Sequence, residues 1–207
     1  MSNLTKRVLT SAAIVAVIGA AALFDLIRPL AVLIAVGMCA EVVICKIKTK
    51  TKFGPVLSSF FILHSSLLIT SAYAVGEKPW ILLLMAMIIM SADTGAWFFG
   101  RRFGGDLMWR ELSPGKTWTG QIAGILCGTM ASVMYGLLGA DTFLPSLMWI
   151  GMGVALLSQY GDLTASAIKR KLNVKDFGNC LPGHGGLMDR FDGWIFALPV
   201  VWLAIMG

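Results

Sequence analysis

Charged residues are scarce in this chain. Asp, Glu, Lys and Arg make up 14% of its 207 residues, whereas hydrophobic residues make up 57%. Soluble domains carry about 25% charged residues, so the composition excludes a soluble globular protein. An integral membrane protein of the all-α, polytopic class is predicted instead.

Histidine and cysteine are also rare, with two and four residues. Cys39, Cys45 and Cys127 fall in or beside apolar stretches, and Cys180 falls in a polar loop. Their spacing matches neither a zinc site nor a disulfide framework. Internal repeats, low-complexity tracts and soluble appendages are absent as well, which predicts a single membrane domain over residues 1–207.

Long apolar stretches predict about seven transmembrane helices. These expected spans cover residues 8–24, 30–45, 55–75, 80–99, 118–138, 144–163 and 187–206. A signal peptide at 8–24 is the less favoured alternative, because its apolar run is longer than usual.

Basic residues gather in alternate loops. All but two of the 17 Lys and Arg residues, Arg28 and Lys78, lie on one predicted side. The positive-inside rule makes that side the cytoplasm and places the N-terminus there, as in a bacterial inner membrane. Because the net charge of +6 follows this pattern, we expect no nucleic-acid partner.

The densest polar segment is 166–193, SAIKRKLNVKDFGNCLPGHGGLMDRFDG. A charge at bilayer depth costs about 2.5–3.5 kcal/mol, so such residues usually mark a substrate or ion site. The positive-inside rule alone would account for the basic residues, but it does not explain the glycines, the histidine or the Asp189/Asp192 pair.

This segment resembles the signature of the phosphatidate cytidylyltransferases, or CDP-diacylglycerol synthases. The matching residues are Ser166, Lys169, Arg170, Lys175, Asp176, Pro182, His184, Gly185, Gly186, Asp189, Arg190 and Asp192. Residues 91–104 and 113–120 agree as well, whereas the first 90 residues match only in hydropathy.

The resemblance implies transfer of CMP from CTP to phosphatidate, with CDP-diacylglycerol and pyrophosphate as products. It also implies a magnesium ion, for which carboxylate oxygens are suitable ligands. Asp189 and Asp192 are spaced to share one helix face, and Asp162 matches the carboxylate that joins them in the family. A helix cap or an ion pair is the other interpretation of Asp162, and the identity of any second cation stays open.

Cationic side chains are expected to bind the phosphates. Lys169 and Arg170 are predicted catalytic residues, and they share a face with Ser166 if the sixth span continues as a helix. Arg170 or Arg190 suits bidentate binding of a phosphate, while Lys116, Lys169 and Lys175 act as point charges. The signature adds Asp176 to the predicted substrate-binding residues.

Two glycine-containing stretches are predicted to approach the phosphates through their backbone. Gly185 and Gly186 permit conformations that turn N–H groups toward an anion, and His184 is expected to bind substrate or shape this loop. In the second stretch, Ser113, Lys116 and Thr117 lead into the fifth span, whose N-terminus favours a phosphate.

Asp93 lies well inside the fourth span. It either caps a broken helix or faces a hydrated cavity as part of the site, and we favour the cavity because an unpaired Asp facing lipid is untenable.

Several alternatives stay open. The chain departs from the family at Thr119 and Ala165, where glutamates are usual, which leaves full activity and substrate preference undecided. Another lipid phosphate, such as an isoprenoid glycerol ether, an ion or solute transporter, and an inactive scaffold are the competing functions. Whether the chain works as a monomer or a homodimer is also open.

Overall fold

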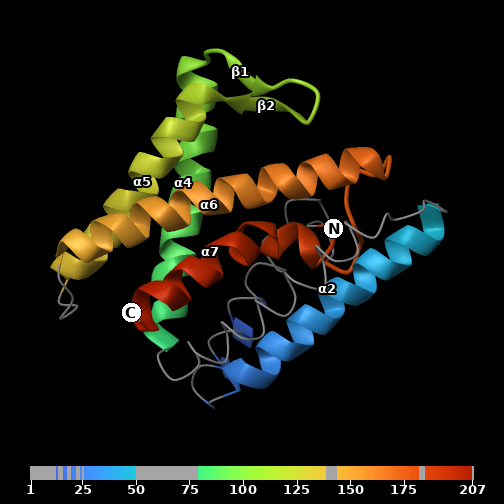
Figure 1. The fold of residues 1–207 in the computed structure, drawn as a ribbon, viewed down its shortest axis with the longest axis horizontal. Coiled ribbons are helices and arrows are strands. Elements are labelled where there is room, and N and C mark those ends of the chain that lie inside the picture. The colour runs from blue at the N-terminus through green and yellow to red at the C-terminus, as the bar shows by residue number, and fades with distance from the viewer. Residues whose placement is uncertain are drawn as a thin grey trace.

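The computed structural model describes residues 26–49, 79–138, 144–181 and 185–206, with a few single positions before residue 26. These ranges form the helices α2 (Ile27–Thr49), α4 (Pro79–Phe103), α5 (Trp118–Leu137), α6 (Leu144–Lys171) and α7 (Met188–Met206). An antiparallel hairpin of β1 (Leu107–Trp109) and β2 (Ser113–Thr117) joins α4 to α5 (Figure 1). The prediction of a mostly helical chain is confirmed. The hairpin was not predicted.

Three helices of the described part are long and apolar enough to cross a membrane. They cover Arg28–Thr49, Ile81–Phe103 and Trp118–Leu137. The predicted spans at 144–163 and 187–206 coincide with α6 and α7, whereas those at 8–24 and 55–75 fall largely or wholly outside the described residues. Helix α6 runs on to Lys171, so the condition under which Ser166, Lys169 and Arg170 were placed on one continuous helix is met.

The helix surfaces are apolar as well. Large hydrophobic side chains such as Leu33, Leu126, Met130 and Trp149 are well exposed on α2, α5 and α6. In water such surfaces would be an aggregation hazard, but lipid is a suitable solvent for them. Together with the three apolar helices, they identify the chain as a membrane protein.

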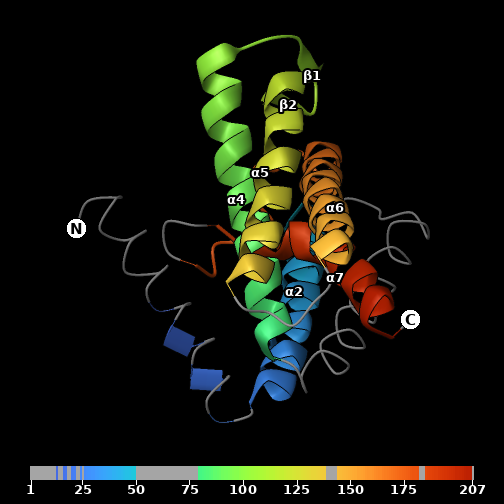
Figure 2. The same ribbon diagram turned by 90° about the vertical axis from the view of Figure 1, so that its left-hand side faces the viewer.

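Small residues bring α4 and α5 close together along most of their length (Figure 2). A Cβ atom added at Gly120 would lie 2.7 Å from the carbonyl oxygen of Ala96, and one at Gly124 would lie 2.8 Å from that of Ala92. Helix pairs in membranes associate through such small residues, because they let the backbones approach. This contact places the first turns of α5 beside the second half of α4.

A second close contact sets the crossing of α6 and α7. Gly161 faces the backbone of Asp192 and Gly193, and a Cβ atom at Gly193 would lie 3.2 Å from the carbonyl oxygen of Ser158. The hydrophobic core combines buried side chains of four helices, among them Val42, Ile88, Val154 and Ala197. The crossing therefore fixes where the polar residues next to Gly161 and Gly193 lie.

Candidate active site

Two cavities meet at Asp93 and Asp162, which line both of them. The first, here called the hairpin cavity, measures about 250 Å³, and its polar lining comprises Asp93, Lys116, Thr117, Gln121, Gln159 and Asp162. The second, the carboxylate cavity, measures about 280 Å³, and its charged lining comprises Asp93, Asp162, Lys169, Asp176, Asp189, Arg190 and Asp192. The fold thus gathers residues from α4, β2, α6 and α7 at one place.

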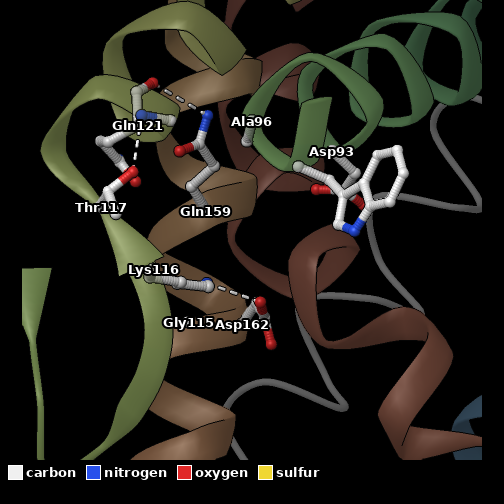
Figure 3. A pocket seen from close by; sticks show the side chains of 10 residues that line it. Asp93, Ala96, Gly115, Lys116, Thr117, Gln121, Gln159 and Asp162 are labelled. Carbon is white, nitrogen blue, oxygen red and sulfur yellow. Dashed lines mark hydrogen bonds and ion pairs between the residues drawn. The ribbon is translucent and has the colours of Figure 1, made fainter. Parts of the chain in front are cut away.

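An ion pair and a helix cap organise the hairpin cavity (Figure 3). Lys116 Nζ lies 2.6 Å from Asp162 Oδ2, so strand β2 is held against α6. Thr117 caps α5, because its Oγ1 accepts a hydrogen bond of 3.1 Å from Gly120 N. The N-terminus of α5 therefore lies beside a lysine, and both the helix N-terminus and the lysine favour an anion.

Two buried glutamines complete this cavity. Gln159 Nε2 donates to the carbonyl oxygen of Gln121 at 3.4 Å, and Gln121 Nε2 is buried without a hydrogen-bond partner among the described residues. Sequence reasoning missed both, because a glutamine inside an apolar stretch belongs to no motif that we used.

Asp189 anchors the carboxylate cavity. Its side chain is only 3% exposed, and Oδ1 lies 2.8 Å from Lys169 Nζ, whose side chain is 12% exposed. The other oxygen, Oδ2, accepts hydrogen bonds from Phe177 N at 2.9 Å and Gly186 N at 3.0 Å. Asp189 therefore holds the end of α6 and the backbone at Phe177 and Gly186 against the first turn of α7.

The other carboxylates of this cavity are less constrained. Asp192 Oδ1 accepts a hydrogen bond of 2.8 Å from the backbone of its neighbour Gly193. Asp176 is exposed in the loop, and its Oδ1 would lie 3.3 Å from a Cβ atom at Gly185. Helix α4 continues unbroken through Asp93, so the structure excludes the cap interpretation and leaves Asp93 as a lining residue.

The predicted metal ligands Asp162, Asp189 and Asp192 line this one cavity. Asp93 and Asp176 line it as well, so the carboxylates outnumber the two basic residues, Lys169 and Arg190. Such an excess of carboxylate oxygens suits a divalent cation. However, no three His, Cys, Asp or Glu side chains of the described residues are grouped closely enough to hold a metal ion. The donor chemistry fits, but the carboxylates do not form a ready-made cluster.

Several predicted residues lie outside both cavities. Arg170 is exposed, and its Nε lies 3.5 Å from the carbonyl oxygen of Leu112 in the hairpin. Ser113 begins β2, Ser166 is half-buried on α6, and Lys175 is exposed in the loop. His184 falls outside the described residues.

The glycines of the signature have defined roles. Gly185 has a φ of +86°, a backbone conformation that residues with a side chain rarely adopt. Its carbonyl oxygen accepts a hydrogen bond from Leu181 N at 2.9 Å. Gly186 turns its N–H toward Asp189. In this structure the Gly186 N–H group is therefore directed at a carboxylate of the protein itself, and the expected approach of these glycines to a phosphate stays a prediction.

One residue that contacts the signature segment comes from α2, far from it in the sequence. Glu41, in α2, accepts a hydrogen bond from Met188 N at 3.0 Å. A carboxylate within an apolar span was the only sequence signal for it.

Comparisons with known proteins identify the family of the chain. The pattern of the Cytidylyltransferase family matches residues 2–206. The phosphatidate cytidylyltransferase of Bacillus subtilis is 39% identical over 121 residues, which are 58% of this chain and 45% of that protein. The enzyme of the same name from Staphylococcus aureus is 41% identical over 119 residues, 56% of this chain and 45% of the relative. The aligned part thus spans about half the length of these relatives, while the family pattern covers nearly the whole chain, which therefore belongs to the Cytidylyltransferase family.

Proposed function

We propose that this protein transfers CMP from CTP to phosphatidate. A phosphate oxygen of the lipid attacks the α-phosphorus of CTP, the bond from that phosphorus to the bridging oxygen breaks, and pyrophosphate leaves with the bonding electrons. The observation that carries the proposal is the joined pair of cavities, which sets Lys116, Lys169 and Arg190 beside a row of carboxylates. Family membership and the names of the relatives support it.

Binding and charge neutralisation are the protein's main tasks in such a reaction. Lys116 and the N-terminus of α5 would hold phosphate groups in the hairpin cavity, with Thr117 shaping that N-terminus. Lys169 and Arg190 would do so in the carboxylate cavity. Ser113, Ser166, Arg170 and Lys175 lie farther out, so any contact with substrate would be at the rim.

Magnesium, when bound, would neutralise phosphate charge and polarise the phosphorus–oxygen bonds. Asp162 and Asp192 would hold it together with Asp189, whose Oδ1 carries one contact and so retains a lone pair. Asp93 lines the same cavity and is available as a further oxygen donor.

The direct test uses purified protein with CTP labelled at the α-phosphate, magnesium and a lipid phosphate, followed by lipid chromatography. We expect label in the lipid fraction with phosphatidate and none after chelation of magnesium. Label with an isoprenoid glycerol ether phosphate but not with phosphatidate would reassign the substrate. Absence of labelled lipid with both would refute a cytidylyltransferase.

Replacing Lys116 should lower the rate of CMP transfer more than replacing a lysine at the end of α2. A charge-assisted hydrogen bond contributes about 1.5–3 kcal/mol, so Lys116→Gln should lower kcat/KM for CTP by roughly tenfold to a hundredfold. The matched control is Lys48, an exposed lysine outside both cavities, and Lys48→Gln should leave the rate unchanged.

Arg170→Lys should also lower the rate less than Lys116→Gln, because Arg170 lies outside the cavities. Equal losses in Lys116→Gln and Lys48→Gln would contradict these roles.

The basic residues also lead us to propose seven spans with a cytoplasmic N-terminus and active site. In a protein whose native cysteines are replaced by serine, Asp106→Cys should react with a membrane-impermeant maleimide only from the cytoplasm. Leu138→Cys, at the opposite end of α5 and well exposed, should react only from outside. Labelling of both from one side would disprove this orientation.

A further inference from the structure

Glu41 connects the N-terminal half of the chain to the signature loop. Its Oε2 accepts the hydrogen bond from Met188 N across a sequence separation of 147 residues. The other oxygen, Oε1, is buried and has no hydrogen-bond partner among the described residues. A carboxylate in this setting is costly, so its presence calls for a functional reason.

Two glycines of the loop pack directly on Glu41. A Cβ atom added at Gly178 would lie 2.6 Å from Glu41 Oε1, and its three nearest neighbours would all be Glu41 atoms. A Cβ atom at Gly186 would lie 2.7 Å from Glu41 Oε2 and 3.0 Å from Asp189 Oδ2. The loop therefore contacts two carboxylates, those of Glu41 and Asp189.

The hydrogen bond from Met188 also fixes the start of α7. The first N–H groups of a helix have no partner within the helix, and a negative charge beside them is stabilising. Met188 is the first residue of α7, and Asp189 and Asp192 lie in the turn that follows. Holding this N–H group thus sets the position of both carboxylates relative to α6.

We propose that Glu41 is a positioning residue for the proposed CMP transfer. It holds Gly178, Gly186 and Met188 in the positions that present Asp189 and Asp192 to the carboxylate cavity. Glu41 lines neither cavity, so it acts through the loop and the first turn of α7 and does not contact substrate. This inference rests on the proposed function, since its kinetic test requires CMP transfer.

A double-mutant cycle tests the contact. Gly178→Ala should lower kcat about tenfold or more, because its new Cβ forces either the loop or the Glu41 carboxylate to move and so disturbs the hydrogen bond from Met188 N. Glu41→Ala should also lower kcat, with a smaller change in KM for CTP. In the Glu41→Ala background, however, Gly178→Ala should cost almost nothing, because the colliding side chain is gone. Losses that simply add would overturn the inference.

Two further measurements separate positioning from general damage. Glu41→Gln keeps an acceptor for Met188 N–H and should retain more activity than Glu41→Ala; equal loss in both would contradict the role of this hydrogen bond. Trypsin should cleave after the exposed Lys175 faster in Glu41→Ala than in the wild type. Unchanged cleavage together with unchanged kcat would also overturn the inference. If the wild-type protein showed no CMP transfer, the proposed function would be refuted. The rate of trypsin cleavage would still test whether Glu41 holds the loop.

Discussion

Replacing Asp189 with Asn should abolish CMP transfer and also destabilise the folded protein. The carboxylate is 3% exposed and holds Lys169 and two backbone N–H groups. Removing one partner of a buried ion pair leaves the other charge uncompensated, at a cost of about 3–5 kcal/mol. Thermal unfolding in detergent and the initial rate of lipid labelling measure the two effects.

Asp192→Asn is the variant to compare with Asp189→Asn. Its carboxylate lines the same cavity, but among the described residues it accepts a hydrogen bond only from the backbone N–H of its neighbour Gly193. We expect it to lose transfer while its unfolding temperature stays close to that of the wild type. A wild-type rate in Asp189→Asn would remove Asp189 from the site, and equal destabilisation of both variants would contradict the anchoring role.

Gly161→Ala should have a comparably large effect through packing alone. A Cβ atom at this position would overlap the carbonyl oxygen of Asp192 and lie 3.1 Å from Gly193 Cα. Both are backbone atoms, so α6 and α7 would have to separate, which typically costs about 1–3 kcal/mol. A displacement of about 1 Å at a reacting group can cost about a hundredfold in rate, and Asp162 and Asp192 are both at this crossing.

Gly115→Ala provides the control, since nothing lies within 4 Å of its added Cβ atom, although it lines the hairpin cavity beside Lys116. It should keep nearly the wild-type rate and unfolding temperature. If the two variants had similar rates, the crossing of α6 and α7 would not control the geometry of the carboxylates.

The helices of the site could be predicted because apolar composition and length determine them locally. The fifth span, expected at 118–138, is α5 at Trp118–Leu137. The sixth was expected to end at residue 163, and apolar composition could not predict that α6 runs on through polar residues to Lys171. Contacts between distant segments are a different matter. The bond from Met188 to Glu41 and the pairing of Leu107 with Thr117 depend on the packed arrangement, which no local pattern encodes.

Arg170 illustrates the limit of motif-based roles. Its neighbour Lys169 faces Asp189, but consecutive residues on a helix point in different directions, so Arg170 faces the hairpin. The motif places both bases near the site, whereas only the rotation of α6 decides which of them lines the cavity.

The contact of Glu41 with α7 bears on how the protein is made. Ribosomes deliver α2 to the membrane well before α7, and domains generally begin to fold from their N-terminal parts during synthesis. Throughout that interval the carboxylate of Glu41 lacks the N–H group of Met188, because that residue has not yet been translated. The loop that carries Asp176 can therefore take its final shape only once α7 has been inserted, so the site is assembled late in biogenesis.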